Sequence, residues 1–316
     1  MRRATTTARG GRFAACLAAV LSIAGSQALA QDVTIGPQLR EGDQFRLEMV
    51  RLRENSQQPQ QNGRSRTLVN VAVISVTADG VLLDWAPGDT TFDNQQVAQN
   101  PLLAAAVQAA SGLKFRLTLN PDGELTGMAN QAEVAPKLQA IVDTMLQGLA
   151  ANLPAEQRQG LITFASQILS PELLIASAVR EASIYFGLNG VSLAAGDEAE
   201  FEIEQASPFG GAAIPATFRV RMDSATADSA SLTTAVTYDS AALWRVTESL
   251  AKQAGKPIPP DELARMPPID IRDQGTYLFD RTLGLMREVI VNRHIAVGGV
   301  RRLDGWEIRL LEGPRR

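Results

Sequence analysis

The sequence is poor in the residues that most often carry catalysis and metal binding: its 316 residues include one cysteine and one histidine. A single thiol leaves no disulfide within the chain, and zinc sites of the cysteine-rich or histidine-rich kinds cannot be assembled. Cys16 lies in a segment that we expect to be removed, so a cysteine nucleophile is excluded as well. His294 lies in the alternating segment 288–297, which is typical of a strand, and we interpret it as a structural residue of the surface or the core.

Aromatic residues are also few, at 5% of the chain, and no stripe of aromatic and basic side chains is present. The chain has 30 basic and 34 acidic side chains. Four arginines and no acid fall within residues 1–30, so the remainder is more acidic than the whole. An acidic surface repels phosphate backbones, and we therefore expect no nucleic-acid partner.

Several catalytic motifs are missing. The sequence contains no G-x-S-x-G elbow of serine hydrolases, no phosphate-binding glycine loop and no EF-hand spacing. Gly210-Gly211 and Gly298-Gly299 are best explained as turns. Asp270, Asp273 and Asp280 lie near one predicted hairpin, which leaves a carboxylate-dependent hydrolase open as an alternative. We assign no catalytic, cofactor-binding or metal-binding residue, and we expect neither an enzyme nor a cofactor.

The first 30 residues have the features of an export signal. Their basic start is followed by the apolar run 13–25 and by Ala28-Leu29-Ala30, the order of a secretory peptide with its cleavage site. An apolar run of thirteen residues is shorter than the 18 or more needed to cross a bilayer. We therefore predict cleavage near Ala30/Gln31, a periplasmic or secreted protein, and no transmembrane segment in the mature chain.

The segment after the leader predicts strands. Residues 44–52, 68–76 and 81–85 alternate or are continuously apolar, and residues 55–66 between the first two are rich in Gln and Asn, which predicts a mobile hairpin loop. A helix is expected after Pro101, and two further strands, 113–119 and 124–128, should meet at the Asn120–Gly123 turn.

The middle of the chain changes to helical spacing. Leu138, Ile141, Met145 and Leu149 follow the i, i+3, i+4, i+7 pattern of one helix face. With the helix starts near 155 and 171, this predicts three helices across residues 131–184, each with one apolar face that should cover a sheet.

The last third returns to strands and echoes the first. Gly196-Asp197 stands before a strand as Gly42-Asp43 does, and the hairpin at 276–290, with Gly284 in its turn, resembles the one around Gly123. Strands at 216–222 and 231–238 and a helix at 240–253 lie between them. The chain is expected to close with a strand over 301–311, or with a hairpin that turns at Asp304-Gly305.

Together these patterns predict an α+β fold of curved antiparallel β-sheets in two tandem strand-rich halves, with a helical insert that covers one face. The predicted segments are a signal peptide at 1–30, a first strand-rich half at 31–130, the helical insert at 131–186, and a second strand-rich half at 187–316 that can form a single domain with 31–130.

The Gly42-Asp43 and Gly196-Asp197 strand openings, the Asn120–Gly123 hairpin and the Tyr277–Gly284 hairpin resemble uncharacterised families of exported bacterial proteins. Those families have no assigned activity, so the resemblance implies an exported α+β protein and no site residues. In its plan of strands and covering helices the chain is also distantly similar to periplasmic lipoprotein carriers.

Three functions remain open at this point. The first is a cell-envelope binding or carrier protein for an apolar, lipid-like ligand held between sheet and helices. The second is a structural or assembly partner that contacts another envelope protein through a sheet edge or a helix face. The third is the carboxylate-dependent hydrolase. The sequence does not identify the ligand, the partner or the oligomeric state.

Overall fold

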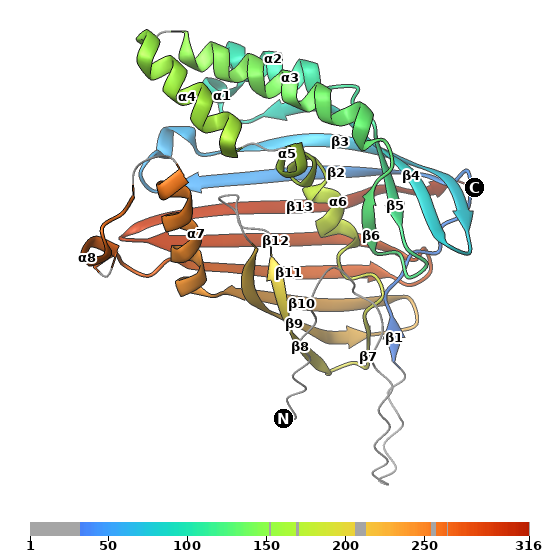
Figure 1. The fold of residues 1–316 in the computed structure, drawn as a ribbon. Helices are drawn as coiled ribbons and strands as arrows, with labels where there is room; N and C mark the ends of the chain where they lie inside the picture. Colours follow the sequence, from blue (N-terminus) through green and yellow to red (C-terminus); the bar gives the residue numbers. More distant parts are fainter. Residues whose placement is uncertain are drawn as a thin grey trace.

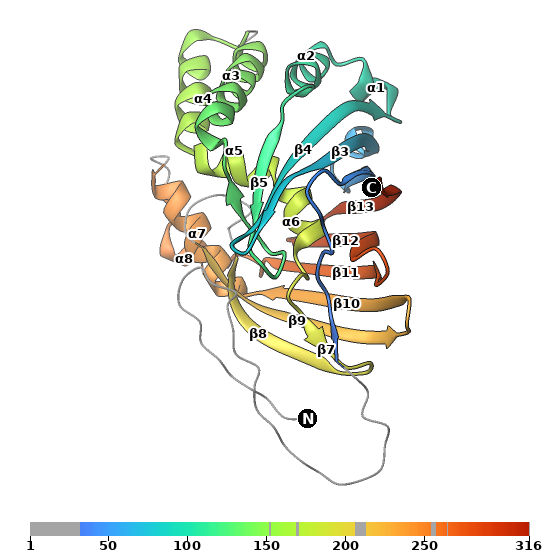
Figure 2. The same cartoon turned by 90° about the vertical axis from the view of Figure 1, so that its right-hand side faces the viewer.

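The computed structural model describes residues 32–151, 153–168, 171–205, 213–253, 257–263 and 265–315. Most strand residues belong to one large, strongly curved sheet, and the helices lie on its concave face and along its upper rim (Figures 1 and 2). The described strands, in chain order, are β1 (Val33–Thr34), β2 (Gln44–Asn55), β3 (Gly63–Thr77), β4 (Gly80–Phe92), β5 (Phe115–Leu119), β6 (Leu125–Met128), β7 (Ser192–Leu193), β8 (Glu198–Gln205), β9 (Ile214–Ala225), β10 (Ser229–Tyr238), β11 (Asp270–Asp280), β12 (Leu285–Val297) and β13 (Val300–Arg315).

The sheet joins both strand-rich parts of the chain. Its eleven strands run in the order β6-β5-β4-β3-β2-β13-β12-β11-β10-β9-β8, and β1 pairs with β7 in a separate two-stranded sheet. Neighbours are antiparallel, and the chain closes the middle of the sheet by pairing β13 with β2, residues more than 240 positions apart. Among the described strands β6 and β8 stay at the two edges, so the sheet is curved and not closed. The predicted α+β class with a curved antiparallel sheet is confirmed.

The helices form two groups. The described ones are α1 (Gln95–Ala98), α2 (Pro101–Ala110), α3 (Gln131–Ala150), α4 (Ala155–Ile168), α5 (Pro171–Ala178), α6 (Arg180–Phe186), α7 (Ser240–Gln253) and α8 (Pro260–Leu263), with a 3₁₀ turn η1 at Pro59–Gln61. Figure 2 shows α2, α3 and α4 along the rim near β4 and β5, while α6 lies inside the curve of the sheet. Within the described residues no helix combines the length and hydropathy needed to cross a bilayer.

Two apolar clusters fill the concave face. In the first, Tyr185 and Phe186 of α6 pack against Trp85 of β4, with ring centroids 6.3 and 6.2 Å from the indole. In the second, Leu243 of α7 packs with Ile214 and Ile271 on the strands near the β8 edge. Edge-to-face aromatic packing and full burial make α6 an integral part of the core.

The two glycine–aspartate openings adopt the same local structure. Gly42 has φ +85° and Gly196 has φ +90°, values that favour glycine. The Gly42 amide donates to the Val73 carbonyl (3.0 Å) and the Val73 amide to the Asp43 carbonyl (2.8 Å). The Gly196 amide donates to the Met222 carbonyl (2.7 Å), and the Met222 amide donates to Asp197 (2.9 Å). The sequence echo is therefore a shared turn that starts β2 and β8.

The structure also departs from the sequence predictions at two places. Residues 63–66 are not a loop: they extend β3 because they pair in register with β2. Four helices are present among the described residues of 131–186, where three were predicted, because the segment after Pro171 divides into α5 and α6. At the end of the chain the predicted final strand is confirmed. Strand β13 continues through Asp304-Gly305, held on both sides by β2 and β12, so the alternative hairpin is not formed.

Candidate functional site

A row of alternating charges crosses the concave face of the sheet. The residues at directly paired positions are Arg53 of β2, Asp304 of β13, Arg293 of β12 and Asp273 of β11. They share the face of the apolar core, since Trp306 and Val291 lie two residues away on the same strands and side chains alternate along a strand. The row separates the apolar cluster around α6 from the one around α7.

Arg293 and Asp273 form the tightest pair of this row. The Nε and Nη2 atoms of Arg293 donate to the two carboxylate oxygens of Asp273 at 2.7 and 2.6 Å, and the side chains are 16% and 13% exposed. Tyr238 completes the group: its hydroxyl accepts from Arg293 at 2.7 Å and donates to Asp273 at 3.1 Å. Such a bidentate, partly buried pair is a strong contact whose members depend on each other.

The ionisation of this group is fixed. Burial by itself lowers the pKa of Arg293, but the hydrogen bonds and charge of Asp273 outweigh it and raise the pKa. Burial, followed by the charge of Asp273, raises the pKa of Tyr238. At neutral pH the arginine stays charged and the phenol stays protonated, so the group has no proton to exchange. We interpret it as structural.

The other end of the row is rich in arginine. Asp304 accepts from Arg302 at 2.8 Å and lies 3.5 Å from Arg53. The pKa of Arg53 is lowered by burial and, next, by the charges of Arg302 and Arg51, while Asp304 opposes this shift. Two guanidinium groups, those of Arg53 and Arg302, therefore share the Asp304 carboxylate, and Arg51 adds a third positive charge close to Arg53.

Two of the cavities in the described part of the chain lie beside helices. One, of about 150 Å³, lies on the concave face under α6; its lining residues are Met49, Val50, Arg51, Ser65, Thr67, Glu181, Trp306 and Ile308. The other, of about 300 Å³, is a groove between α2 and α3, lined by Ala105, Ala106, Ala109, Leu113, Lys137, Ala140, Ile141, Thr144 and Met145. Small-molecule sites measure about 300–1,000 Å³, so of these two cavities the α2–α3 groove reaches that range.

The three acids singled out from the sequence do not come together. Asp270 pairs with Arg272 at 2.8 Å, and Asp273 belongs to the concave row. Asp280 lies at the β11–β12 turn, seven residues and roughly 23 Å of strand from Asp273. Each acid has an arginine partner, and they share no cleft.

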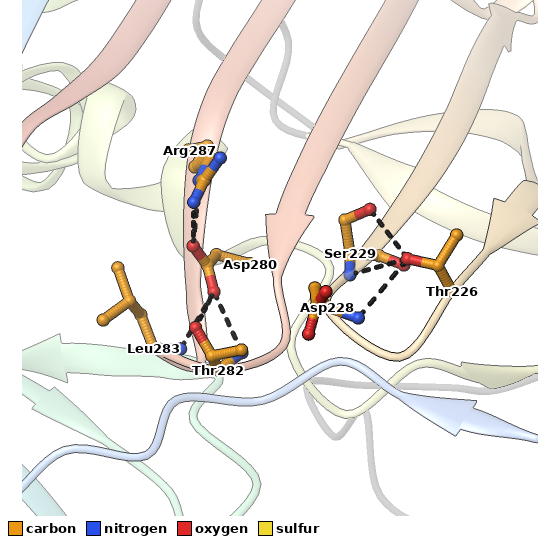
Figure 3. A network of polar contacts seen from close by, with 7 residues as sticks. All are labelled: Thr226, Asp228, Ser229, Asp280, Thr282, Leu283 and Arg287. Carbon is orange, nitrogen blue, oxygen red and sulfur yellow. Dashed lines mark hydrogen bonds and ion pairs between the residues drawn. The ribbon is translucent and has the colours of Figure 1, made fainter.

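Figure 3 shows the surroundings of Asp280. Its carboxylate accepts from the amides of Thr282 (2.9 Å) and Leu283 (3.0 Å) and from Arg287 (2.8 Å). Burial is the largest single influence and would raise the pKa of Asp280, but these hydrogen bonds, with that of the Thr282 hydroxyl, outweigh it and lower the pKa. The neighbouring turn is closed by Thr226, which accepts from the Ser229 amide at 3.1 Å. Asp280 is therefore a turn-forming residue.

The remaining sequence predictions also find their places. His294 is exposed on the outer face, between Arg272 and Leu303 in the sheet register. Gly298-Gly299 form the β12–β13 turn with φ +54° and +85°. Gly210-Gly211, Cys16 and the leader with its cleavage site lie outside the described residues. Among the described residues no cluster of three or more histidine, cysteine, aspartate or glutamate side chains could hold a metal ion.

Sheet edges offer little for a partner. β6 has four residues, and β8 carries glutamates at every second position, of which Glu198 and Glu200 pair with Arg219. Short and charged edge strands resist pairing with another chain. The edge-mediated form of the partner hypothesis is therefore disfavoured.

Sequence reasoning missed the charged row and the cavity beside it. A sequence signal for the row was present. Arg53, Arg293 and Asp304 lie in strands whose residues alternate between polar and apolar, at core-facing positions where an apolar residue is expected. A charge at such a position requires a partner. The pairing of distant strands that supplies the partner is not encoded locally.

Comparisons with known proteins give little guidance. No family model and no curated protein matches the chain, so the resemblance to uncharacterised exported families stays an expectation. Among solved structures, one that concerns lipid–protein interactions in lipovitellin is similar, with 8% identity and a TM-score of 0.44. The match covers 87% of this chain and 26% of that chain, so this chain spans about a quarter of the lipovitellin chain.

Proposed function

We propose that the protein binds an apolar or amphiphilic small molecule outside the cytoplasm, as a cell-envelope binding or carrier protein, and that the α2–α3 groove receives the aliphatic part of that molecule. The observation that carries this proposal is the groove itself, about 300 Å³ between two helices. Export is supported by the leader with its predicted cleavage near Ala30/Gln31.

The groove exists because the facing side chains are small. At one end the helices touch where Gly148 meets Leu102: a Cβ at Gly148 would lie 2.1 Å from Leu102 Cδ2. Beyond this contact, alanines of α2 face Ala140 of α3 and do not fill the space between the helix axes. Because α2 and α3 touch at one end and carry small side chains beyond it, the space between them stays open as a groove.

The polar groups of the groove are already paired. Lys137 lies 2.7 Å from Glu133, and the Thr144 hydroxyl donates to the Ala140 carbonyl at 2.8 Å. What remains for a ligand is apolar surface, with Ile141 and the adaptable thioether of Met145. This chemistry suits a hydrocarbon chain better than a polar solute.

The proposal is tested with a fluorescent fatty acid titrated into the delipidated protein. We expect saturable binding, weakened about tenfold or more by Ala109→Phe, since a phenyl ring fills the groove and tenfold corresponds to the loss of a few buried methylene groups. The matched control is Ala104→Phe, because Ala104 is exposed on the same helix, as Ala109 is, but lies outside the groove lining. Absence of saturable binding, or equal affinities in the two variants, would overturn the proposal.

A further inference from the structure

The α2–α3 groove is closed at one end by a leucine side chain. Leu102, in the first turn of α2, meets Gly148 of α3 so closely that a Cβ at Gly148 would lie 2.1 Å from Leu102 Cδ2 and 3.0 Å from Cδ1. The groove lining begins one turn further along each helix, at Ala105 of α2 and Met145 of α3. The Leu102 side chain therefore stands where the groove ends.

The position of Leu102 is fixed by the start of its helix. Asn100 caps α2, and its Oδ1 accepts from the amides of Leu102 at 3.0 Å and of Leu103 at 3.3 Å. Pro101 follows the cap, and its ring sets the backbone angle φ of this turn. Because the backbone is held and the side chain is packed against α3, the closed end is a fixed wall for a chain that lies in the groove.

The opposite end of the groove lies at the surface. There the lining consists of Leu113, which follows α2, and Lys137 in the second turn of α3. The Lys137 side chain is 52% exposed, and its partner Glu133 is 64% exposed. A polar head group at this end stays in contact with water, whereas the Leu102 end receives the terminal part of a hydrocarbon chain.

The distance between the two ends limits the length of that chain. Lys137 and Met145 are eight residues apart on α3, which corresponds to about 12 Å along the helix axis. An extended hydrocarbon chain advances about 1.25 Å per bond, given a carbon–carbon bond of about 1.5 Å and an angle of about 111°. The groove therefore accommodates about nine or ten bonds of an extended chain.

We infer that Leu102 sets the chain length of the ligand, so that the groove prefers a single unbranched chain of about ten carbon atoms, with its methyl end at Leu102 and its head group at Lys137. This inference rests on the function proposed above and specifies the class of ligand and its orientation. A longer chain has to leave its additional methylene groups in water, because the wall at Leu102 stops the methyl end. Those groups then add little to the affinity.

The test is a series of straight-chain saturated fatty acids, from hexanoic to hexadecanoic acid, that compete with the fluorescent fatty acid for the delipidated protein. Each acid is used below its micelle-forming concentration, and all carry the same head group, so differences report on the chain. Affinity should rise about two- to fourfold per methylene group, since full burial of one methylene corresponds to about fourfold. It should level off near decanoic acid.

Two variants move the closed end in opposite directions. Ala105→Leu adds a larger side chain to the lining at an exposed position one turn inside Leu102, and it should move the plateau to acids shorter by about three or four carbon atoms, the length of that turn. Leu102→Ala removes the wall and should move the plateau to longer acids. The matched controls are Ala104→Leu and Leu103→Ala, which make the same changes on α2 outside the lining.

Each outcome decides the inference. A plateau near decanoic acid that moves in opposite directions in the two variants, and in neither control, supports it. Saturable binding without a plateau up to hexadecanoic acid, or a plateau that either folded variant leaves in place, overturns the role of Leu102 and leaves the proposed function standing. If circular dichroism shows that Leu102→Ala does not fold, Ala105→Leu decides alone. Absence of saturable binding by every acid overturns the proposed function and this inference together.

Discussion

Removal of the Asp273 carboxylate should destabilise the fold far more than removal of a surface carboxylate with equally good geometry. In Asp273→Asn, Arg293 keeps its charge but loses the partner that accepts two hydrogen bonds, at 2.6 and 2.7 Å. Both side chains are largely buried, at 16% and 13% exposed, and breaking such a pair costs about 3–5 kcal/mol. We expect about 3 kcal/mol, the lower end, because the Tyr238 hydroxyl still accepts from Arg293.

The assay is urea unfolding at pH 7, followed by circular dichroism. The matched control is Glu288→Gln, which breaks the 2.7 Å contact with Arg309 on the outer face, where the side chains are 38% and 48% exposed. Surface pairs of this kind contribute about 0–1 kcal/mol. Similar losses in the two variants would refute the reasoning from burial.

A double-mutant cycle separates the pair from its surroundings. Asp273→Leu and Arg293→Met should each be strongly destabilising, whereas the double variant should lose clearly less than the sum, because no buried charge is left unpaired. We expect a coupling of about 2 kcal/mol. Additive losses would show that Arg293 finds another counter-ion, with Asp304 the nearest candidate in the row.

Two further predictions concern the turns. Because the pKa of Asp280 is lowered, the stability that its carboxylate contributes is present above the unfolded pKa of about 4 and is lost as the pH falls through the folded pKa. Asp280→Asn should therefore lower the urea midpoint at pH 7 and differ less from the wild type at pH 3. A difference that stays constant with pH would contradict this assignment. Gly80→Ala would place a Cβ 2.0 Å from the Leu119 carbonyl oxygen at φ +138°. It should lower the thermal midpoint much more than Gly299→Ala does, because Gly299, at φ +85°, has open space around its Cβ position and an expected loss of about 1–2 kcal/mol. Equal midpoints in the two variants would show that the β3–β4 turn relaxes.

Local signals predicted the elements well. The helix at 240–253 has the bounds of α7, and Asn120–Gly123 forms the expected turn, in which the Gly123 amide donates to Asn120 at 2.9 Å. In α2, Asn100 caps the helix by accepting from the Leu102 amide at 3.0 Å, just before Pro101. These features depend on residues within a few positions of each other, so the sequence contains them directly.

Features that depend on distant strands were not predictable in the same way. Asp304-Gly305 is a strong turn signal, yet Gly305 is a strand residue packed between β2 and β12: a Cβ there would lie 3.0 Å from Asn292 Oδ1 and 3.2 Å from Leu52 Cβ. Asp304 likewise contacts Arg53, which is about 250 positions away, in addition to its closer contact with Arg302 on the same strand. The candidate sites were missed for the same reason, because the Trp306 cavity and the α2–α3 groove arise from packing between separate segments.

The charged row has a further consequence for how the sheet specifies its own alignment. A slip of one residue between two strands moves every side chain to the opposite face. If the concave face were purely apolar, such a slip would replace its apolar side chains by those of the outer face, which also includes Val50, Leu52 and Ile290. With the row present, a slip of β12 against β11 would separate Arg293 from Asp273, which are both largely buried, and leave a charge without its partner, which is strongly unfavourable. The Arg293–Asp273 pair thus favours one register between β11 and β12 of the eleven-stranded sheet, while Asp304 adds a weaker contact with Arg53 across the junction of β2 and β13.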